Sequence, residues 1–240
     1  MVLVRGGTYA EQVIISKSGT RFRPLIITAF PGETPVIDGQ YQIPSTDNDS
    51  ANCNDTVSPP QCFNYEHLVR IEGDHVVFNG FEIRHSLGRG LVVYRYDDIP
   101  TGIVITNNNI HDNREAGILL HEANGIIVSN NDISYNSNYA THDRDSSELN
   151  WSAGVISVRS ENIVYRRNII HNNWGEGLIT ANYSGSTNIV IDDNVFYDNY
   201  ALQLYVHRSH NVGVQRNLVY CTDDARVFRG SDYTYGIILA

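Results

Sequence analysis

The chain has few of the residues that mark several large classes of protein. It has one lysine, Lys17, and a net charge of −10 at pH 7 over 240 residues. Nucleic acids and anionic membranes are bound by basic surfaces, so the composition argues against both as partners. No run of about 18 apolar residues is present, which excludes a transmembrane helix.

Cysteine is also scarce, with three residues in the chain. Cys53 and Cys62 lie nine residues apart, the first within and the second directly after a polar stretch, 45–61, rich in Asp, Asn, Ser and Pro. We expect a disulfide to close this loop, which indicates an oxidising compartment. No set of residues has the spacing of a zinc site.

Helix-length amphipathic stretches are missing, and a short repeated phrase takes their place. The phrase is an aliphatic triplet, then an Asn five residues after its first member, then an apolar residue two positions later. Its copies begin at Ile103, Ile126, Ile163, Ile189 and Val212, and a degenerate copy without the Asn begins at Val76. The intervals are 126 − 103 = 23, 163 − 126 = 37, 189 − 163 = 26 and 212 − 189 = 23 residues. A period of this size indicates a repeat architecture, and strand-length apolar runs predict strands joined by turns.

Two residue types define the turns of each unit. We expect the Asn of each phrase to take the left-handed conformation at a sharp turn and to hydrogen-bond to its equivalents as a ladder. These residues are Asn108, Asn131, Asn168, Asn194 and Asn217. A glycine precedes a third aliphatic run at Gly90, Gly117, Gly154 and Gly177. Each coil is therefore predicted to have three short strands, with a minimum period of 23 residues.

This pattern resembles the right-handed parallel β-helix (pectin lyase-like) superfamily, the fold of pectate lyases, polygalacturonases, alginate lyases and alginate epimerases. The opening 7–11 and the phrases at 18–27 and 31–39 look like a first coil of such proteins. The resemblance implies an all-β solenoid and a single domain over 1–240. It says little about chemistry, because one scaffold hosts many functions.

The chain begins and ends inside apolar runs, at 1–5 and 236–239. An uncapped solenoid end exposes its core, so we expect a segment of a longer protein with an export signal and caps beyond it. A short chain capped by oligomerisation is the alternative.

The insertions point to one face of the solenoid. The largest are 40–66 and 137–152, and both flank the sheet of Gly strands, which we expect to be the floor of a groove. In the resembled enzymes the sugar chain lies along that sheet. Outward positions predict two rows: Arg70, Val92, Leu119, Ile156, Ile179, Tyr205 and Phe228, then Tyr94, His121, Val158, Ala181 and His207.

The predicted floor is largely apolar. It lacks the clustered Asp of polygalacturonases and calcium pectate lyases, so neither activity carries over. We expect it to be covered by the loops, by a partner or further coils, or by sugar rings stacked on Tyr94, Tyr205 and Phe228.

Two acids at the rim suggest hydrolysis. Glu115 and Glu176 lie just before Gly117 and Gly177. Two coils separate them, or roughly 9 to 10 Å, close to the limit for an inverting pair of carboxyl groups. The insertion between them adds His142 and Asp143, and Trp174 stands beside Glu176. A rim carboxylate paired with Arg114 or Arg144 is the other interpretation of Glu176.

A second set of residues suggests β-elimination. Removing the proton next to a uronic carboxyl group needs a base and a cation, and the resembled alginate lyases and epimerases use such sets. His121, His207, Tyr205 and Arg208 are the candidates. Each histidine can equally be a strand-edge residue with a hydrogen bond.

Calcium is a further possibility. Asp143 and Asp145, or Asp97 and Asp98, offer oxygen ligands, although adjacent loop acids are usually solvated. Bound Ca²⁺ would also let this acidic chain hold a polyanionic sugar.

The sequence therefore predicts a secreted carbohydrate-active enzyme that hydrolyses a polysaccharide. Glu176 and a second acid, Glu115 or one from 137–152, would act, while Trp174, Tyr205 and Phe228 hold sugar rings. One alternative is a lyase or epimerase acting on a uronic acid polymer. The other is a non-catalytic surface β-helix that binds glycans or proteins.

Overall fold

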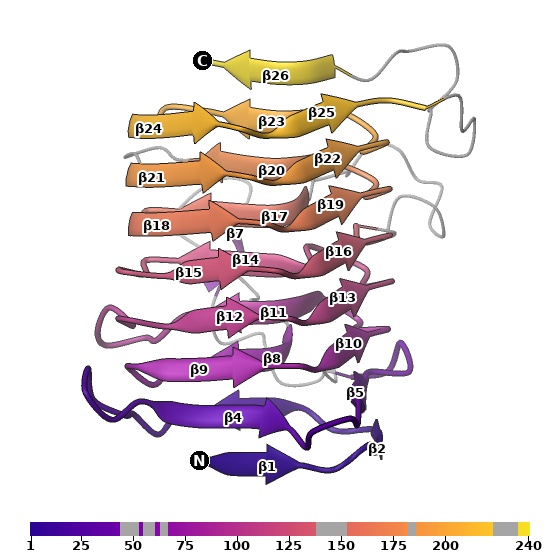
Figure 1. Cartoon of the computed structure of the whole chain (residues 1–240), viewed down its shortest axis with the longest axis vertical. Coiled ribbons are helices and arrows are strands. Elements are labelled where there is room, and N and C mark those ends of the chain that lie inside the picture. Colours follow the sequence, from indigo (N-terminus) through magenta and orange to yellow (C-terminus); the bar gives the residue numbers. More distant parts are fainter. Residues whose placement is uncertain (44–52, 55–60, 63–66, 138–152, 182–185, 223–234) are drawn as a thin grey trace.

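The computed structural model describes residues 1–43, 53–54, 61–62, 67–137, 153–181, 186–222 and 235–240. These residues form a stack of coils with three parallel sheets of eight strands each (Figure 1). Each complete coil gives one strand to each sheet, and every strand pairs with its equivalent in the next coil. The prediction of a parallel solenoid with three strands per coil is confirmed.

The three sheets are named here A, B and C. Sheet A contains β1 (Val2–Val4), β4 (Leu25–Ala29), β9 (Val76–Asn79), β12 (Val104–Thr106), β15 (Ile127–Ser129), β18 (Glu161–Arg166), β21 (Thr187–Asp192) and β24 (His210–Gln215). Sheet B contains β2 (Gly7–Tyr9), β5 (Pro35–Asp38), β10 (Glu82–Arg84), β13 (Asn109–His111), β16 (Asp132–Ser134), β19 (Ile169–His171), β22 (Val195–Tyr197) and β25 (Leu218–Tyr220). Sheet C, built from the Gly strands, contains β3 (Val13–Ile15), β8 (His67–Ile71), β11 (Arg89–Val93), β14 (Ile118–His121), β17 (Ala153–Val158), β20 (Glu176–Ala181), β23 (Leu202–Val206) and β26 (Tyr235–Leu239).

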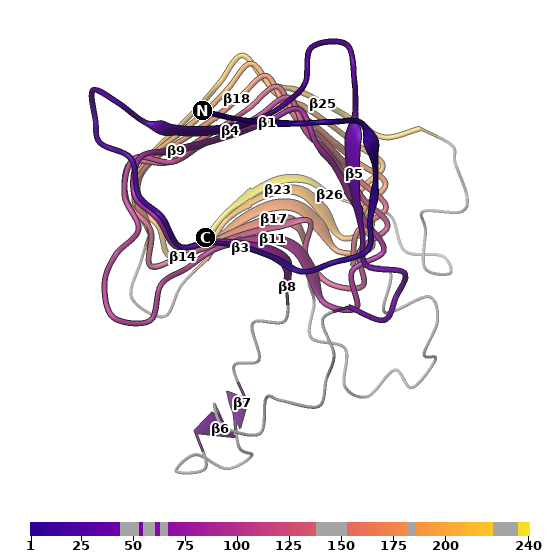
Figure 2. The ribbon, with the colours of Figure 1, turned by 90° about the horizontal axis from the view of Figure 1, so that it is seen from below.

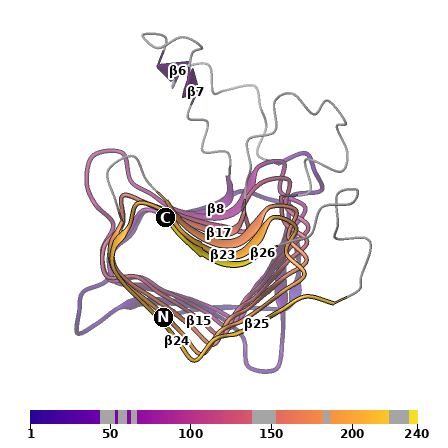
Figure 3. The ribbon, with the colours of Figure 1, turned by 90° about the horizontal axis from the view of Figure 1, so that it is seen from above.

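The three sheets enclose the interior of the stack (Figures 2 and 3). The core inside them is a column of buried apolar side chains. In sheet A, for example, each residue of one row pairs with its equivalent in the next coil. The row runs from Ile105 through Val128 and Tyr165 to Ile191. All four side chains have no exposed surface. Burying each aliphatic side chain contributes about 1.5 to 3 kcal/mol, which explains why the triplets recur at fixed positions.

The predicted Asn ladder is present in the turn between sheets A and B. The side-chain amide of each member donates to the carbonyl oxygen of the next, at 3.0 Å for every pair from Asn108 to Asn217. Our assignment of the left-handed conformation to these Asn residues was wrong. The residue before each of them has the positive φ, of 54° or 55°: Asn107, Asn130, Arg167, Asp193 and Arg216. The ladder Asn is selected for its buried amide rather than for its backbone.

A second ladder, not predicted, lies in the turn between sheets B and C. It runs from Asn113 through Asn136, Asn173 and Asn199 to Gln203, with amide-to-oxygen distances of 2.8, 3.1, 2.9 and 2.8 Å. Each of its Asn residues follows a member of the first ladder by five positions, since 113 − 108 = 5 and 136 − 131 = 5. That repeated offset was the signal in the sequence.

The second ladder explains the glycines that open the sheet C strands. A Cβ atom at Gly90, Gly117, Gly154 or Gly177 would lie 2.6 to 2.8 Å from the amide nitrogen of a ladder Asn. Atoms cannot approach so closely, so a side chain at these positions would displace the ladder.

We expect Gly117→Ala to lower the free energy of unfolding by about 3 kcal/mol. Its Cβ would meet Asn136 Nδ2 at 2.7 Å and the backbone oxygen of Gly154 at 2.9 Å. Gly213→Ala is the matched control, because its nearest atom, Ile189 O, is 4.0 Å away. The control should be neutral or stabilising by up to about 1 kcal/mol. Urea denaturation of both variants checks this, and equal losses would contradict it.

The two cysteines predicted to form a disulfide lie in a short antiparallel hairpin. In this hairpin, β6 (Cys53–Asn54) pairs with β7 (Gln61–Cys62), and Cys53 is directly opposite Cys62. The backbone register is compatible with the disulfide, which stays a prediction.

Candidate functional site

The outer face of sheet C has nearly the rows predicted for the floor. Arg70, Val92, Leu119, Ile156, Ile179 and Tyr205 are neighbours in successive strands. The position next to Tyr205, which was predicted for Phe228, is occupied by Ile238. The reason is that β26 begins later than expected, at Tyr235. Phe228 itself lies outside the described residues.

This face is not uniformly accessible. Val92 and Leu119 are 0% and 4% exposed, whereas Ile156, Ile179 and Tyr205 are only partly buried. The floor is therefore buried over β11 and β14, and it is partly exposed at Arg70 on β8 and again over three neighbouring strands, β17, β20 and β23. Glu176 opens the middle strand of these three.

Glu176 is an acid in an apolar setting. Its residue is 8% exposed, and it pairs in the sheet with Ala153. Burial raises the pKa of its carboxyl group, and only its own backbone amide acts against this. Within the described part of the chain it forms no ion pair, so the alternative pairing with Arg114 is not found; Arg144 lies outside that part.

Glu115 has the opposite environment. Its carboxylate forms an ion pair with Arg89 at 2.6 Å, and its side chain is 35% exposed. The register shows that Ala116, and not Glu115, is equivalent to Glu176, because Ala153 pairs with Glu176 and Val155 with Ile118. Glu115 lies one residue earlier and two coils away, a separation of roughly 10 Å along the stack.

An aromatic pair lies next to Glu176. The rings of Trp174 and Tyr200 have centroids 6.0 Å apart and planes at 32°. Their backbones are fixed by the second ladder, since Trp174 N donates to Asn136 O and Tyr200 N to Asn173 O, both at 2.9 Å. Tyr200 was not predicted. It follows Trp174 by 200 − 174 = 26 residues, the interval of that coil, which identifies the two as equivalent positions.

The residues considered for β-elimination fall into two separate pairs. His121 contacts Tyr94 edge to face, with ring centroids 5.2 Å apart. His207 stacks on Tyr205 at 5.1 Å. The row runs from His121 through Val158 and Ala181 to His207, so three strand spacings, or roughly 14 Å, separate the histidines. They cannot act together on one sugar unit.

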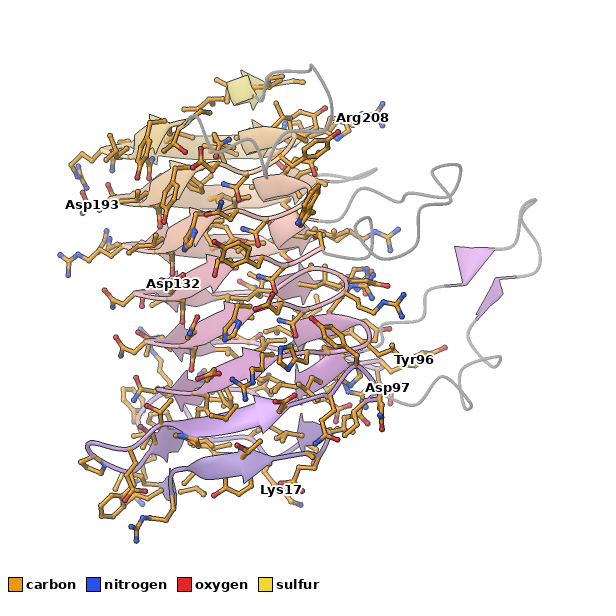
Figure 4. All side chains as sticks on the ribbon, turned by 90° about the vertical axis from the view of Figure 1, so that its right-hand side faces the viewer. Lys17, Tyr96, Asp97, Asp132, Asp193 and Arg208 are labelled. Atoms are coloured by element: carbon orange, nitrogen blue, oxygen red, sulfur yellow. The ribbon has the colours of Figure 1, made fainter. Side chains whose placement is uncertain are left out.

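His121 is the more unusual of the two histidines. It is 8% exposed, and burial lowers its pKa to about 4, so it is neutral at pH 7. Arg208, the cation considered with this set, follows β23 and lies with Asp97 at one edge of the molecule, several coils apart (Figure 4).

Of the calcium ligands considered from the sequence, the described pair, Asp97 and Asp98, belongs to no metal-binding cluster. Asp98 accepts hydrogen bonds from Arg95 at 2.9 Å and from the Ile99 amide at 2.8 Å. Over the described ranges, no group of three or more His, Cys, Asp or Glu side chains is placed to hold a metal ion. His142, Asp143 and Asp145 lie outside those ranges.

We expect the free energy of unfolding to depend on pH because the Glu176 carboxyl group is buried. The folded state holds the Glu176 proton above the ordinary pKa of 4.5, so this residue lowers the free energy of unfolding as pH rises through and beyond that value. Glu176→Gln removes this dependence. Compared with the wild type, the variant should gain stability between pH 4 and pH 7, measured by urea denaturation at both. A constant difference would show that Glu176 ionises normally.

Comparison with known proteins identifies the family. A family model described as a right-handed β-helix region matches residues 62–237. The chain belongs to this right-handed β-helix family. No curated protein sequence matches it significantly. In the described residues, no helix is long and apolar enough to cross a membrane.

Solved structures support the same fold at low sequence identity. XylC in complex with xylose is 12% identical with a TM-score of 0.61, covering 98% of this chain and 61% of XylC. A mutant of the periplasmic alginate epimerase AlgG is 15% identical with a TM-score of 0.51, covering 98% of this chain and 45% of AlgG. The chain thus spans about half of these proteins, and the similarity establishes the fold alone.

Proposed function

We propose that this chain is a carbohydrate-active β-helix protein that hydrolyses a polysaccharide on the outer face of sheet C, with Glu176 as the general acid. The observation that carries the proposal is a buried carboxyl group without a described ion-pair partner, whose pKa is raised, beside an aromatic pair. Carboxyl groups with a raised pKa cluster at functional sites, because a group that keeps its proton to a higher pH than usual can donate it to a substrate.

The chemistry needs two carboxyl groups in different states. Glu176 would give its proton to the glycosidic oxygen as the bond to the anomeric carbon breaks. A water molecule would attack that carbon and lose a proton to a carboxylate on the other side. Glu115 is the candidate for this second role, since its carboxylate is held in an ion pair with Arg89. Their separation of roughly 10 Å is near the upper end for an inverting enzyme.

The aromatic residues would hold the sugar chain. Trp174 with Tyr200, and Tyr205 with His207, lie on neighbouring coils of sheet C and its preceding turn. Two proteins with similar structures carry carbohydrate names, one solved with xylose and one an alginate epimerase. Together with the expected disulfide between Cys53 and Cys62, this supports a polysaccharide partner and an extracellular location.

A uronate lyase or epimerase is the second candidate, and one observation favours it. His121 is held neutral at pH 7 against Tyr94, so it can accept a proton. His207 is too far away to assist it, and Tyr94, which was predicted as a sugar-stacking residue, contacts the His121 ring instead. A non-catalytic glycan-binding β-helix is the third possibility.

The direct test is to incubate the protein with a panel of polysaccharides, with and without Ca²⁺. Reducing ends and the ultraviolet absorbance of unsaturated ends are followed together. Reducing ends alone are the expected result and mean hydrolysis. A parallel rise of both signals would mean elimination and move the catalytic role to His121. No change in either signal, with saturable glycan binding, would mean a binding module.

A further inference from the structure

We infer that the sugar unit beside Glu176 is neutral, and that Trp174 and Tyr200 form the surface that selects it. The inference rests on the proposed function only in placing a polysaccharide at this position; it does not depend on cleavage. It assigns a substrate class, neutral glycans rather than uronic acid polymers, and a specificity role to Tyr200.

The first observation is that, among the described residues, no cation compensates the Glu176 carboxyl group. The pKa of its carboxyl group is shifted by burial and by its own backbone amide, and no described charged side chain contributes. A uronic carboxylate placed here would be desolvated beside another acid, and none of the described side chains at this position offers it a cation. Burying an unpaired charge costs several kcal/mol, so such a unit would be excluded.

In the row of sheet C that contains Glu176, the nearest cation to this acid is Arg89. In successive strands it reads Arg89, Ala116, Ala153, Glu176 and Leu202. Arg89 is three strand spacings, or roughly 14 Å, from Glu176 and is already paired with Glu115. Small or apolar side chains occupy the positions on both sides of the acid.

In the described ranges, other basic residues near sheet C are also paired with acids or distant from Glu176. Arg70 pairs with Glu72 at 2.7 Å, and Arg159 pairs with Glu122 at 2.9 Å. Arg208 lies six residues after Leu202, the neighbour of Glu176 in the next coil, and beyond the far end of β23. The single lysine, Lys17, is at the opposite end of the stack from Arg208 (Figure 4).

The aromatic pair offers a stacking surface for an uncharged sugar ring. Trp174 and Tyr200 come from adjacent coils, and their rings are tilted by only 32° at a centroid distance of 6.0 Å. Both side chains are partly exposed. Amphipathic rings present an apolar face and a polar edge, which match the C–H face and the hydroxyl groups of an uncharged pyranose.

The test uses the tryptophan as its own reporter. The chain has two tryptophans, so Trp151→Phe leaves Trp174 as the single tryptophan, which is excited selectively over tyrosine. The unsubstituted protein is titrated alongside. Xylohexaose, cellohexaose and mannohexaose are compared with hexamers of galacturonate and mannuronate at pH 7. Stopped-flow mixing records the fluorescence change before any turnover.

We expect a saturable change with at least one neutral hexamer, and binding at least about tenfold weaker for every uronate. Tyr200→Ala should weaken the neutral binding about tenfold, whereas Tyr200→Phe, which keeps the ring, should restore most of it. Tighter binding of a uronate, or no response to any neutral hexamer, would overturn the inference. Neutral binding without cleavage would refute hydrolysis and leave the inference standing.

Discussion

Glu176→Gln should lower kcat by about 10²- to 10⁴-fold on the hydrolysed polysaccharide, with little change in KM. The glutamine keeps the shape of the side chain but cannot donate a proton to the leaving oxygen, and a general acid contributes a factor of this size. Kinetics on the best substrate of the panel measure the effect. A substrate whose leaving group needs no proton should be cleaved with a much smaller loss.

The matched control is Glu161→Gln. Glu161 opens β18 in sheet A and is exposed, so the same chemical change there should leave kcat and the melting temperature unchanged. A fully active Glu176→Gln variant would remove Glu176 from the mechanism. Loss of activity together with a large fall in melting temperature would mean that the substitution damaged the fold and not the acid.

Asn168→Ala should lower the free energy of unfolding by about 3 to 5 kcal/mol, near the upper end for a single substitution. The Asn168 side chain is fully buried and makes four hydrogen bonds. Its amide donates to Val128 O at 2.9 Å and to Asn194 Oδ1 at 3.0 Å. Its oxygen accepts from the backbone and side-chain nitrogens of Asn131 at 3.1 and 3.0 Å.

The size of this effect comes from the groups left behind. Alanine would leave the Val128 carbonyl and two Asn131 donors buried without partners, each costing about 1 to 3 kcal/mol. Asn109→Ala, on the exposed side of β13, is the control and should change stability by less than about 0.5 kcal/mol. Urea denaturation of the two variants measures the difference. Similar losses at both positions would mean that the ladder adds nothing beyond local strand preferences.

The fold was predictable because its cause is periodic. Ile105, Val128 and Ile191 occupy equivalent positions, and the Asn of each triplet phrase has a fixed offset, so both appear in the sequence as repeats. The left-handed residues were misassigned for a physical reason. Positive φ falls on Arg167 and Arg216 as well as on Asn, so residue type alone does not reveal it.

The site was less predictable, because it depends on burial and on local register. Sequence pattern placed Glu115 and Glu176 as equivalents, but a shift of one residue gives one an arginine partner and leaves the other buried. Asp192 shows the same limit. Adjacent acids such as Asp192 and Asp193 are typical of a solvated face, yet the Asp192 side chain is fully buried and contacts Arg166 and Arg216. The pairing of each acid with a particular arginine depends on how neighbouring coils are aligned. No local sequence motif reveals that alignment.

The ladders also show how the scaffold and its insertions are separated. Asn131 and Asn168 are 168 − 131 = 37 residues apart, and their amide contact is the same 3.0 Å as that of Asn108 and Asn131, which are 131 − 108 = 23 apart. Ser137 and Ala153, at the two ends of the longer coil's extra segment, are joined by a hydrogen bond of 3.3 Å. The chain can therefore lengthen or exchange that segment without altering the repeat, so a recognition surface can be changed one coil at a time.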